Sequence, residues 1–302
     1  MTLPSSSSPS TDLVDGPASL GGEGVAIVVN AAAGSSDDPS DEHCADLLGA
    51  EIITVGDDET LDDALTRADG AKILGIVGGD GSINAAAAHA LATDRPLAVF
   101  PGGTLNHFAR DLGTNEAADT IAALHDGALV TVDVGDIDGK PFLNTASFGS
   151  YADFVDEREK LEGRIGKWAA SLIAAAKVLR HAEPVRVEID GIRRNIWMIF
   201  IGNCEYQPPG LVPSSRSRLD DGLLDVRYVD CAPRSRLRLL RALATGRLAH
   251  TKVFRRTLVQ SLDIHSLDGP LRLARDGETF DGDADVRVSK HPGALAVYAR
   301  RD

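Results

Sequence analysis

Short apolar runs alternate with segments of helical spacing through the first half of this 302-residue chain. The runs lie at residues 25–29, 51–55, 73–77 and 97–100. A continuous apolar run of this length is typical of a strand that is buried on both faces of a parallel sheet. The intervening segments predict helices at 39–48, 60–68, 84–91 and 114–125, with Thr60 as an N-cap. This alternation predicts an α/β domain at residues 25–135.

The pattern changes after residue 135, where runs with strand character predominate. Two long segments of helical spacing interrupt them, at 154–181 and 234–248. The expected strands lie at 131–134, 141–146, 185–189, 195–202, 223–229, 258–264, 271–274 and 294–298. We therefore predict a second, β-rich domain at residues 136–302, whose last strand can return to the first domain. Residues 1–24 are rich in Ser, Pro, Gly and Asp, which predicts a disordered leader.

Charge and cysteine content exclude several classes of protein. A net charge of −14 argues against a nucleic-acid partner, because phosphate contacts need a basic face. Three cysteines far apart in the chain indicate neither a disulfide framework nor a zinc site, and they fit a reducing cytoplasm. The apolar stretch at 168–179 is too short to span a bilayer, and the N-terminus lacks a signal-peptide pattern. We expect a cytoplasmic protein whose membrane contacts are peripheral.

A glycine-rich segment follows the third predicted strand and opens an alanine-rich helix. Its sequence is Gly78-Gly79-Asp80-Gly81-Ser82-Ile83-Asn84. Glycines let backbone amides approach a phosphate, and a helix N-terminus adds free amides and the positive end of its dipole. A carboxylate beside phosphates needs a cation between them, so Asp80 points to magnesium. The segment matches neither a Walker loop nor the Rossmann signature, and a tight turn would be an equally good interpretation of it alone.

Two further loops of small residues follow neighbouring strands. The loop after the first strand is Asn30-Ala31-Ala32-Ala33-Gly34, and the loop after the fourth is Pro101-Gly102-Gly103-Thr104-Leu105-Asn106. Ligands of open parallel sheets bind beyond the carboxyl ends of the strands. Three such loops at equivalent positions therefore predict a cradle for a nucleotide.

The segments described above resemble the diacylglycerol kinase catalytic domain family, which is shared with sphingosine and ceramide kinases. Residues 78–84 are similar to the GGDGT-x-N motif of that family, and residues 101–110 resemble its P-x-GT-x-N-x-FAR segment. Other similar segments follow in the family's order, at 132–135, 142–149, 221–226 and 276–278. The resemblance runs from about residue 25 to the C-terminus.

This resemblance implies an α/β nucleotide-binding domain and a β-sandwich-like domain, with the active site in the cleft between them. It implies a kinase that transfers the γ-phosphate of ATP to a lipid hydroxyl, with diacylglycerol or a related lipid as acceptor. Glu278 would be the general base, and Asp80 would help to hold the catalytic Mg²⁺ and the phosphates. A second, structural Mg²⁺ would lie at Asp221, with the backbone carbonyls of Arg218 and Leu223. The residues expected at the nucleotide are Asn30, Ala31, Ala32, Ala33, Gly34, Gly78, Gly79, Asp80, Gly81, Ser82, Ile83, Asn84, Gly103, Thr104 and Asn106.

Some residues depart from the family pattern or have a weaker case. Asp133 is a catalytic candidate at even odds with a polar residue at a strand end. His107 stands where many members have Asp, and neutral imidazole cannot replace a carboxylate on magnesium without loss of charge. Ala31 stands where Pro is common, and Ser82 replaces Thr. The stretch at 202–210 lacks the usual pair of glycines, which leaves the acceptor open.

A basic segment is the expected contact with the membrane. Residues 231–262 contain no Asp or Glu, whereas residues 231–256 carry eight Arg and Lys. Each basic residue near anionic headgroups contributes about 1 kcal/mol, so we expect 231–256 to dock on the inner face of the membrane, where the lipid substrate lies. A solvated basic helix face beside an acidic neighbour is an equal alternative. A homodimer is only a generic expectation.

Two other functions compete with a lipid kinase. A NAD kinase also uses a Gly-Gly-Asp-Gly turn, but residues 106–110, the motif at Asp221 and the basic segment favour the lipid kinase. A non-catalytic regulator that binds a nucleotide or a lipid is suggested by His107, whereas retention of Asp80, Thr104 and Glu278 favours catalysis.

Overall fold

The computed structural model describes residues 24–30, 49–151, 173, 177, 183–210, 213–231, 241, 245 and 253–300. The helix predicted at 39–48 lies outside these residues, as does nearly all of the predicted leader. Only single positions are described within the helices predicted at 154–181 and 234–248. Within the described part of the chain, no helix combines the length and apolar character needed to cross a membrane.

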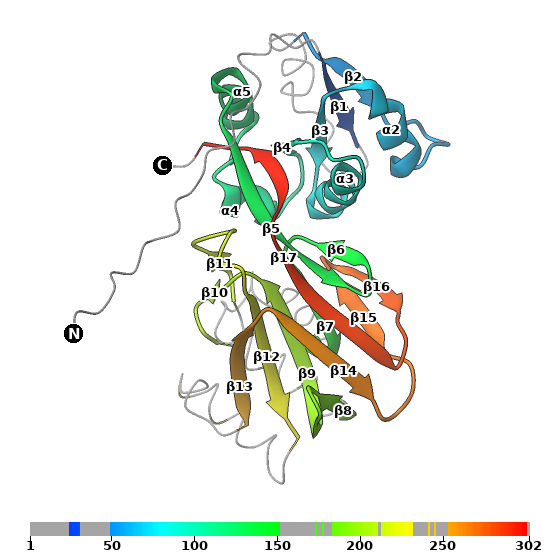
Figure 1. Ribbon diagram of the computed structural model, residues 1–302, viewed down its shortest axis with the longest axis vertical. Helices are drawn as coiled ribbons and strands as arrows, with labels where there is room; N and C mark the ends of the chain where they lie inside the picture. The colour runs from blue at the N-terminus through cyan, green and yellow to red at the C-terminus, as the bar shows by residue number, and fades with distance from the viewer. Residues whose placement is uncertain are drawn as a thin grey trace, which may run out of the picture.

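A parallel sheet with the strand order β2-β1-β3-β4 forms the N-terminal domain (Figure 1). Its strands are β1 (Val25–Val29), β2 (Glu51–Thr54), β3 (Ile73–Gly78) and β4 (Leu97–Pro101). The helices are α2 (Leu61–Arg67), η2 (Ala68–Gly70), α3 (Asp80–Ala92), α4 (His107–Leu112) and α5 (Ala117–Asp126). Alternate residues of β1 face two cores: Val28 packs with α2 and α3, and Ile27 with α5. Helices on both faces explain why β1 is apolar throughout.

The C-terminal domain is built from antiparallel strands around its own apolar core. They are β7 (Thr145–Gly149), β8 (Val185–Ile189), β9 (Ile192–Asn203), β12 (Leu224–Asp230), β13 (Phe254–Val259), β14 (Ser261–Ser266), β15 (Arg272–Arg275) and β16 (Glu278–Asp281). A separate short ladder joins β10 (Tyr206–Gln207) to β11 (Ser215–Arg216). The predicted fold class, an α/β domain followed by a β-sandwich-like domain, is confirmed.

Two long strands run from one domain into the other (Figure 1). Strands β5 (Leu129–Ile137) and β17 (Asp285–Tyr298) pair antiparallel, and the short β6 (Lys140–Phe142) pairs antiparallel with the end of β5. At its end β17 also pairs in parallel with β4, through Val297 and Leu97. The register shifts between His291 and Leu295, so a bulge of β17 lies opposite Asp133. Bulges of this kind bend a strand, and this one lies where the strands pass between the domains.

Several predicted boundaries are wrong for identifiable reasons. The helix predicted from residue 84 begins at Asp80, because Gly79 is its N-cap and the chain turns directly from β3 into α3. The short helix α4 was not predicted, and its N-cap Asn106 adopts a left-handed conformation. The single strands predicted at 141–146 and 258–264 are each divided in two. Thr60 is confirmed as the N-cap of α2 and forms a capping box with Asp63.

Candidate active site

Two glycine loops pack against each other at the carboxyl edge of the parallel sheet. The Gly102 amide donates to the Gly78 carbonyl at 3.0 Å. A Cβ added to Gly103 would lie 2.5 Å from the Gly79 Cα, so a side chain at this position would push the loops apart. Asn106 holds the second loop closed, because its side chain accepts from the Gly103 amide and donates to the Gly103 carbonyl. The contact between the loops fixes the backbone at the start of α3.

Asp80 joins this edge of the sheet to helix α4. Its carboxylate accepts the backbone amides of His107 at 3.1 Å and Phe108 at 3.3 Å, and Asn144 Nδ2 lies 3.5 Å away. Asp80 therefore caps α4 through a tertiary contact, in a position where an N-cap side chain would otherwise act. A carboxylate has about four acceptor positions, so these contacts leave capacity for a cation.

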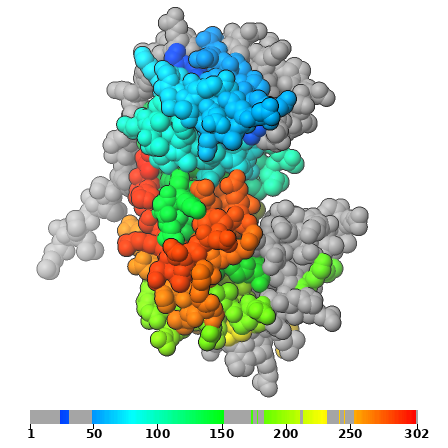
Figure 2. All heavy atoms as spheres, turned by 90° about the vertical axis from the view of Figure 1, so that its right-hand side faces the viewer, coloured from blue at the N-terminus to red at the C-terminus, as the bar shows by residue number. Residues whose placement is uncertain are grey.

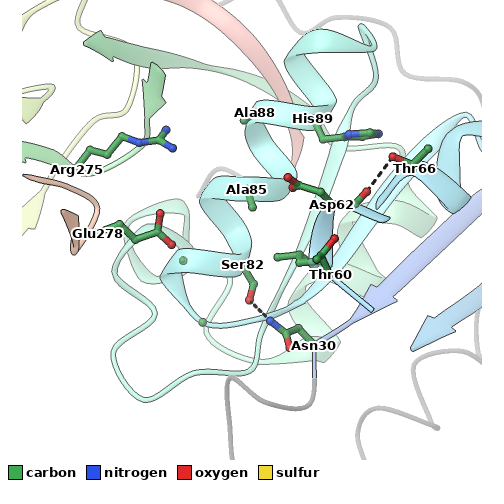
Figure 3. Close-up of a pocket in the computed structure, with 13 residues that line it drawn as sticks. Asn30, Thr60, Asp62, Thr66, Ser82, Ala85, Ala88, His89, Arg275 and Glu278 are labelled. Atoms are coloured by element: carbon green, nitrogen blue, oxygen red, sulfur yellow. Dashed lines mark hydrogen bonds between the residues drawn. The ribbon is translucent and has the colours of Figure 1, made fainter. Parts of the chain in front are cut away.

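A cavity of about 970 Å³ lies between the two domains. In Figure 2 the orange part of the chain that contains β15 and β16 lies directly below the cyan N-terminal domain. Figure 3 shows α3 in the middle of the cavity wall, α2 on one side, and Arg275 and Glu278 on the other. The lining residues are Asn30, Thr60, Leu61, Asp62, Thr66, Gly79, Gly81, Ser82, Ala85, Ala88, His89, Arg275 and Glu278.

Glu278 reaches the cavity from a tight hairpin. Asp276 and Gly277 have φ angles of 42° and 90° and form a two-residue connection between β15 and β16, in which Arg275 pairs with Glu278. Positive φ at both positions is typical of the type I′ turn that favours Asp-Gly. Glu278 is exposed, and a Cβ added to Gly81 would lie 3.7 Å from its Oε1 atom. The hairpin thus places a carboxylate opposite the glycine loop, beside the Arg275 guanidinium.

The half-buried Asp276 carboxylate anchors this hairpin. It accepts the backbone amides of Leu143, Asn144 and Thr145 at 2.7 to 2.9 Å. Burial raises the pKa of Asp276 to about 6, against the effect of the three amides. These bonds explain the gap between β6 and β7, because the amides there turn toward Asp276 instead of continuing a ladder. Asp276 therefore positions Glu278, a role that the sequence motif did not reveal.

The predicted nucleotide residues divide into three groups. Asn30, Gly79, Gly81 and Ser82 line the cavity, and Asn30 Nδ2 donates to Ser82 Oγ at 2.9 Å. Gly78 ends β3, Asp80 begins α3, and Gly103, Thr104 and Asn106 lie in the loop after β4. Ile83 and Asn84 are buried within α3. The predicted contacts at 31–34 lie outside the described residues.

Asp133 and Asp221 lie together in a second cluster and do not line the cavity. Asp133 is 2% exposed and accepts the amides of Gly222 and Gly293. Asp221 accepts the amides of Glu205 and Leu223. The Arg218 side chain is exposed and pairs with Asp220. This cluster joins the two domains at a place separate from the residues around Glu278.

Several cavity residues were not predicted from the sequence. Arg275 could have been found, because an Asp-Gly pair between strand segments predicts a hairpin whose flanking residues face each other. Ala85, Ala88 and His89 follow Gly81 and Ser82 at helical spacing, which could have identified one face of α3. Residues of α2 carry no local signal, because only the tertiary fold brings them to α3. His107 is absent from the lining, and its Nδ1 lies 3.2 Å from Arg110 Nη2.

Comparisons with known proteins agree with this architecture. Residues 24–137 match the family model of the diacylglycerol kinase catalytic domain. Residues 147–299 match the model described as the YegS C-terminal NAD kinase beta sandwich-like domain. A Pseudomonas savastanoi pv. phaseolicola protein named "Probable lipid kinase YegS-like" is 34% identical over 74% of this chain and 75% of its own length.

More distant relatives extend the match. A diacylglycerol kinase of Mycobacterium tuberculosis is 26% identical over 79% of this chain and 80% of its own length. A solved diacylglycerol kinase structure from Bacillus anthracis str. Sterne covers 92% of this chain and 97% of its own, with a TM-score of 0.63 at 20% identity, and shows the same fold. The chain therefore belongs to the diacylglycerol kinase catalytic domain family and is a phosphotransferase of the lipid kinase type, with an alcohol group as acceptor.

Proposed function

We propose that the protein transfers the γ-phosphate of ATP to the hydroxyl of a membrane lipid, with diacylglycerol or a related lipid as acceptor. The observation that carries this proposal is the cavity in which the glycine loop of α3 faces Glu278. Phosphoryl transfer requires that the phosphates and the acceptor be positioned and that charge be neutralised. Loop amides on one wall and a carboxylate on the other are suited to these two tasks.

The phosphates would bind at the start of α3. Gly79, Gly81 and Ser82 line the cavity there, and the free amides of a helix N-terminus attract anions. The groove between α2 and α3 continues from this point over Ala85 and Ala88, whose small side chains leave room for the rest of the nucleotide. Asp80 retains acceptor capacity for Mg²⁺, which would neutralise charge on the phosphates when bound.

Glu278 would act on the acceptor. The lipid hydroxyl oxygen forms a bond to the γ-phosphorus, the bond to the bridging oxygen of ADP breaks, and Glu278 takes the hydroxyl proton. Arg275 lies beside Glu278 in the cavity wall, and its Nη1 donates to the Pro141 carbonyl. Its guanidinium would contact the transferred phosphoryl group from the acceptor side, since Arg matches phosphate geometry.

Arg275→Ala tests this arrangement against a matched control. Arg272 lies on the same strand, is exposed and does not line the cavity, so Arg272→Ala removes an equivalent charge elsewhere. We expect at least a tenfold loss of kcat with diacylglycerol micelles, ATP and Mg²⁺ for Arg275→Ala only. Equal rates in both variants would contradict the role of Arg275. Transfer of phosphate to NAD instead of lipid would overturn the proposed function.

We also propose that residues 231–256 dock on anionic lipid. Most of this segment lies outside the described residues. Of the basic side chains that are described, Arg255 pairs with Asp230 and Arg256 with Glu205 and Asp225, whereas Arg241 is exposed. Charge reversal of Arg234, Arg238 and Arg241 should weaken sedimentation with phosphatidylserine vesicles. Unchanged binding would exclude this segment as the docking surface.

A further inference from the structure

A buried lysine occupies the centre of the second acidic cluster. Lys290 lies on β17 beside the bulge that faces Asp133, where β5 and β17 cross between the domains (Figure 1). Its side chain is 0% exposed, and the Asp133 side chain is 2% exposed. Asn203 and Cys204 reach the same point from the end of β9, and Asp221 reaches it from the loop before β12.

The Lys290 ammonium contacts three side chains of this cluster. Nζ lies 2.5 Å from Asn203 Oδ1, 3.0 Å from Cys204 Sγ and 3.3 Å from Asp133 Oδ2. Two of its three N–H donors have hydrogen-bond acceptors, and the Asp133 carboxylate lies at ion-pair distance. Nζ also lies 4.0 Å from Asp221 Oδ1, within reach of its charge. One cation therefore serves both carboxylates.

This arrangement does not fit the structural Mg²⁺ that the family resemblance predicted at Asp221. Mg²⁺ requires near-octahedral oxygen ligands at about 2.1 Å, whereas the cluster offers a sulfur and a positive charge. The Cys204 sulfur is a poor ligand for Mg²⁺, which prefers oxygen. The Leu223 carbonyl, one of the predicted ligands, accepts the Cys204 amide at 3.0 Å, which leaves one acceptor position on its oxygen.

We propose that the Lys290 ammonium takes the place of a structural divalent cation and joins Asp133 and Asp221 at the domain junction. Lys290 holds β17 to the loop at Asp221 and to the end of β9, so it fixes the angle at which the C-terminal domain presents Glu278. The proposal concerns a structural site and holds whichever acceptor the kinase uses.

Thermal unfolding of the wild-type protein tests the proposal directly. The protein is stripped with EDTA, kept free of nucleotide and melted with increasing Mg²⁺, Mn²⁺ or Ca²⁺. We expect no saturable rise in melting temperature, because the ammonium already neutralises the site. A saturable rise of several degrees that disappears in Asp221→Asn would overturn the proposal. A rise that persists in Asp221→Asn reports a different site and leaves the expected result at this cluster intact.

Lys290→Met tests the stabilising role. Loss of the ammonium leaves two carboxylates uncompensated in the interior, so we expect the melting temperature to fall on the order of 10 °C. Lys140→Met is the matched control, because Lys140 is exposed and lies outside the cluster. Equal melting temperatures for the two variants would overturn the proposal. If Lys290→Met does not fold, the metal titration of the wild-type protein still tests whether the cluster binds a divalent cation.

Lys290→Ala supplies a gain-of-function test. Removal of the side chain leaves Asp133, Cys204 and Asp221, whose ligand atoms lie within 4.8 Å of one another, around a vacated space. We expect Cd²⁺, which favours thiolate and carboxylate ligands, to raise the melting temperature of Lys290→Ala and not that of the wild type. An equal response of both proteins to Cd²⁺ would contradict the placement of Lys290 in a cation site.

Discussion

Arg216 should contribute more to stability than any exposed ion pair in the protein, because it joins the two domains from a fully buried position. Its side chain is 0% exposed and pairs with Asp111 of α4 at 2.7 Å. The same guanidinium donates to the carbonyls of Leu143 and Asn203 and to Asn144 Oδ1, at 2.6 to 3.0 Å. Substitution by Met removes all of these bonds without removing much volume.

The size of this loss of stability depends on the polar groups that Arg216→Met would leave unpaired. Removing one partner of a buried ion pair costs about 3–5 kcal/mol, and each unpaired carbonyl adds about 1 kcal/mol. We expect Arg216→Met to lower the free energy of unfolding by about 6–8 kcal/mol, a large part of the roughly 5–15 kcal/mol of a typical domain. Arg186→Met is the control: Arg186 is 60% exposed in its pair with Asp268, which predicts a loss below about 1 kcal/mol.

Urea unfolding of the two variants measures this difference, followed by far-UV circular dichroism. The double variant Arg216→Met, Asp111→Leu should recover part of the loss, because it no longer buries an unpaired carboxylate. Equal losses in Arg216→Met and Arg186→Met would refute the reasoning. The reasoning would also be refuted if the double variant lost more unfolding free energy than the two single variants lose together.

Two further predictions concern the loop and the hairpin at the cavity. Gly103→Ala should raise the KM for ATP at least tenfold in a coupled kinase assay, because its Cβ would lie 2.5 Å from the Gly79 Cα; an unchanged KM would show that contact between the loops is not needed. Because burial raises the pKa of Asp276 from 3.8 to about 6, the folded state binds a proton more tightly than the unfolded state. The contribution of Asp276 to stability should therefore fall as pH rises from about 4 to about 6, by about 3 kcal/mol in total. Urea unfolding across this pH range should show a smaller decline in the free energy of unfolding for Asp276→Asn than for the wild type. Parallel pH dependences of the two proteins would contradict the raised pKa of Asp276.

The α/β half of the fold could be predicted in detail because each of its signals is local. Val25–Val29 is apolar throughout, and Thr60 is followed by Asp63 in a capping box. The start of α3 was placed too late because Gly81 and Ser82 have low helix propensity. Contacts of Gly79 and Asp80 with the third loop and α4 fix the turn that starts the helix. Helix α4 was missed for a related reason: the carboxylate that caps it, Asp80, lies 27 residues away in sequence.

The roles of the acidic residues in the hairpin and in the second cluster could be predicted only in part. The Asp-Gly-Glu motif identified Glu278 as a catalytic candidate. It did not reveal that Asp276 of the same motif anchors the turn through backbone amides. The sequence suggested even odds for Asp133, and the fold places it opposite the bulge of β17, where Lys290 meets it. No local pattern reveals this pairing, because 157 residues separate the two side chains in the chain of 302.

We propose that Glu278 activates a lipid hydroxyl for attack on ATP. The most direct measurement is transfer of labelled γ-phosphate from ATP to a total lipid extract in the presence of Mg²⁺, with the product identified by mass. Asp281→Asn is the matched control for Glu278→Gln, because Asp281 ends the same strand in an exposed position outside the cavity. We expect a labelled lipid with the wild type and Asp281→Asn, and a rate lower by about 10²–10⁴-fold with Glu278→Gln. A labelled lipid formed equally well by Glu278→Gln would contradict it.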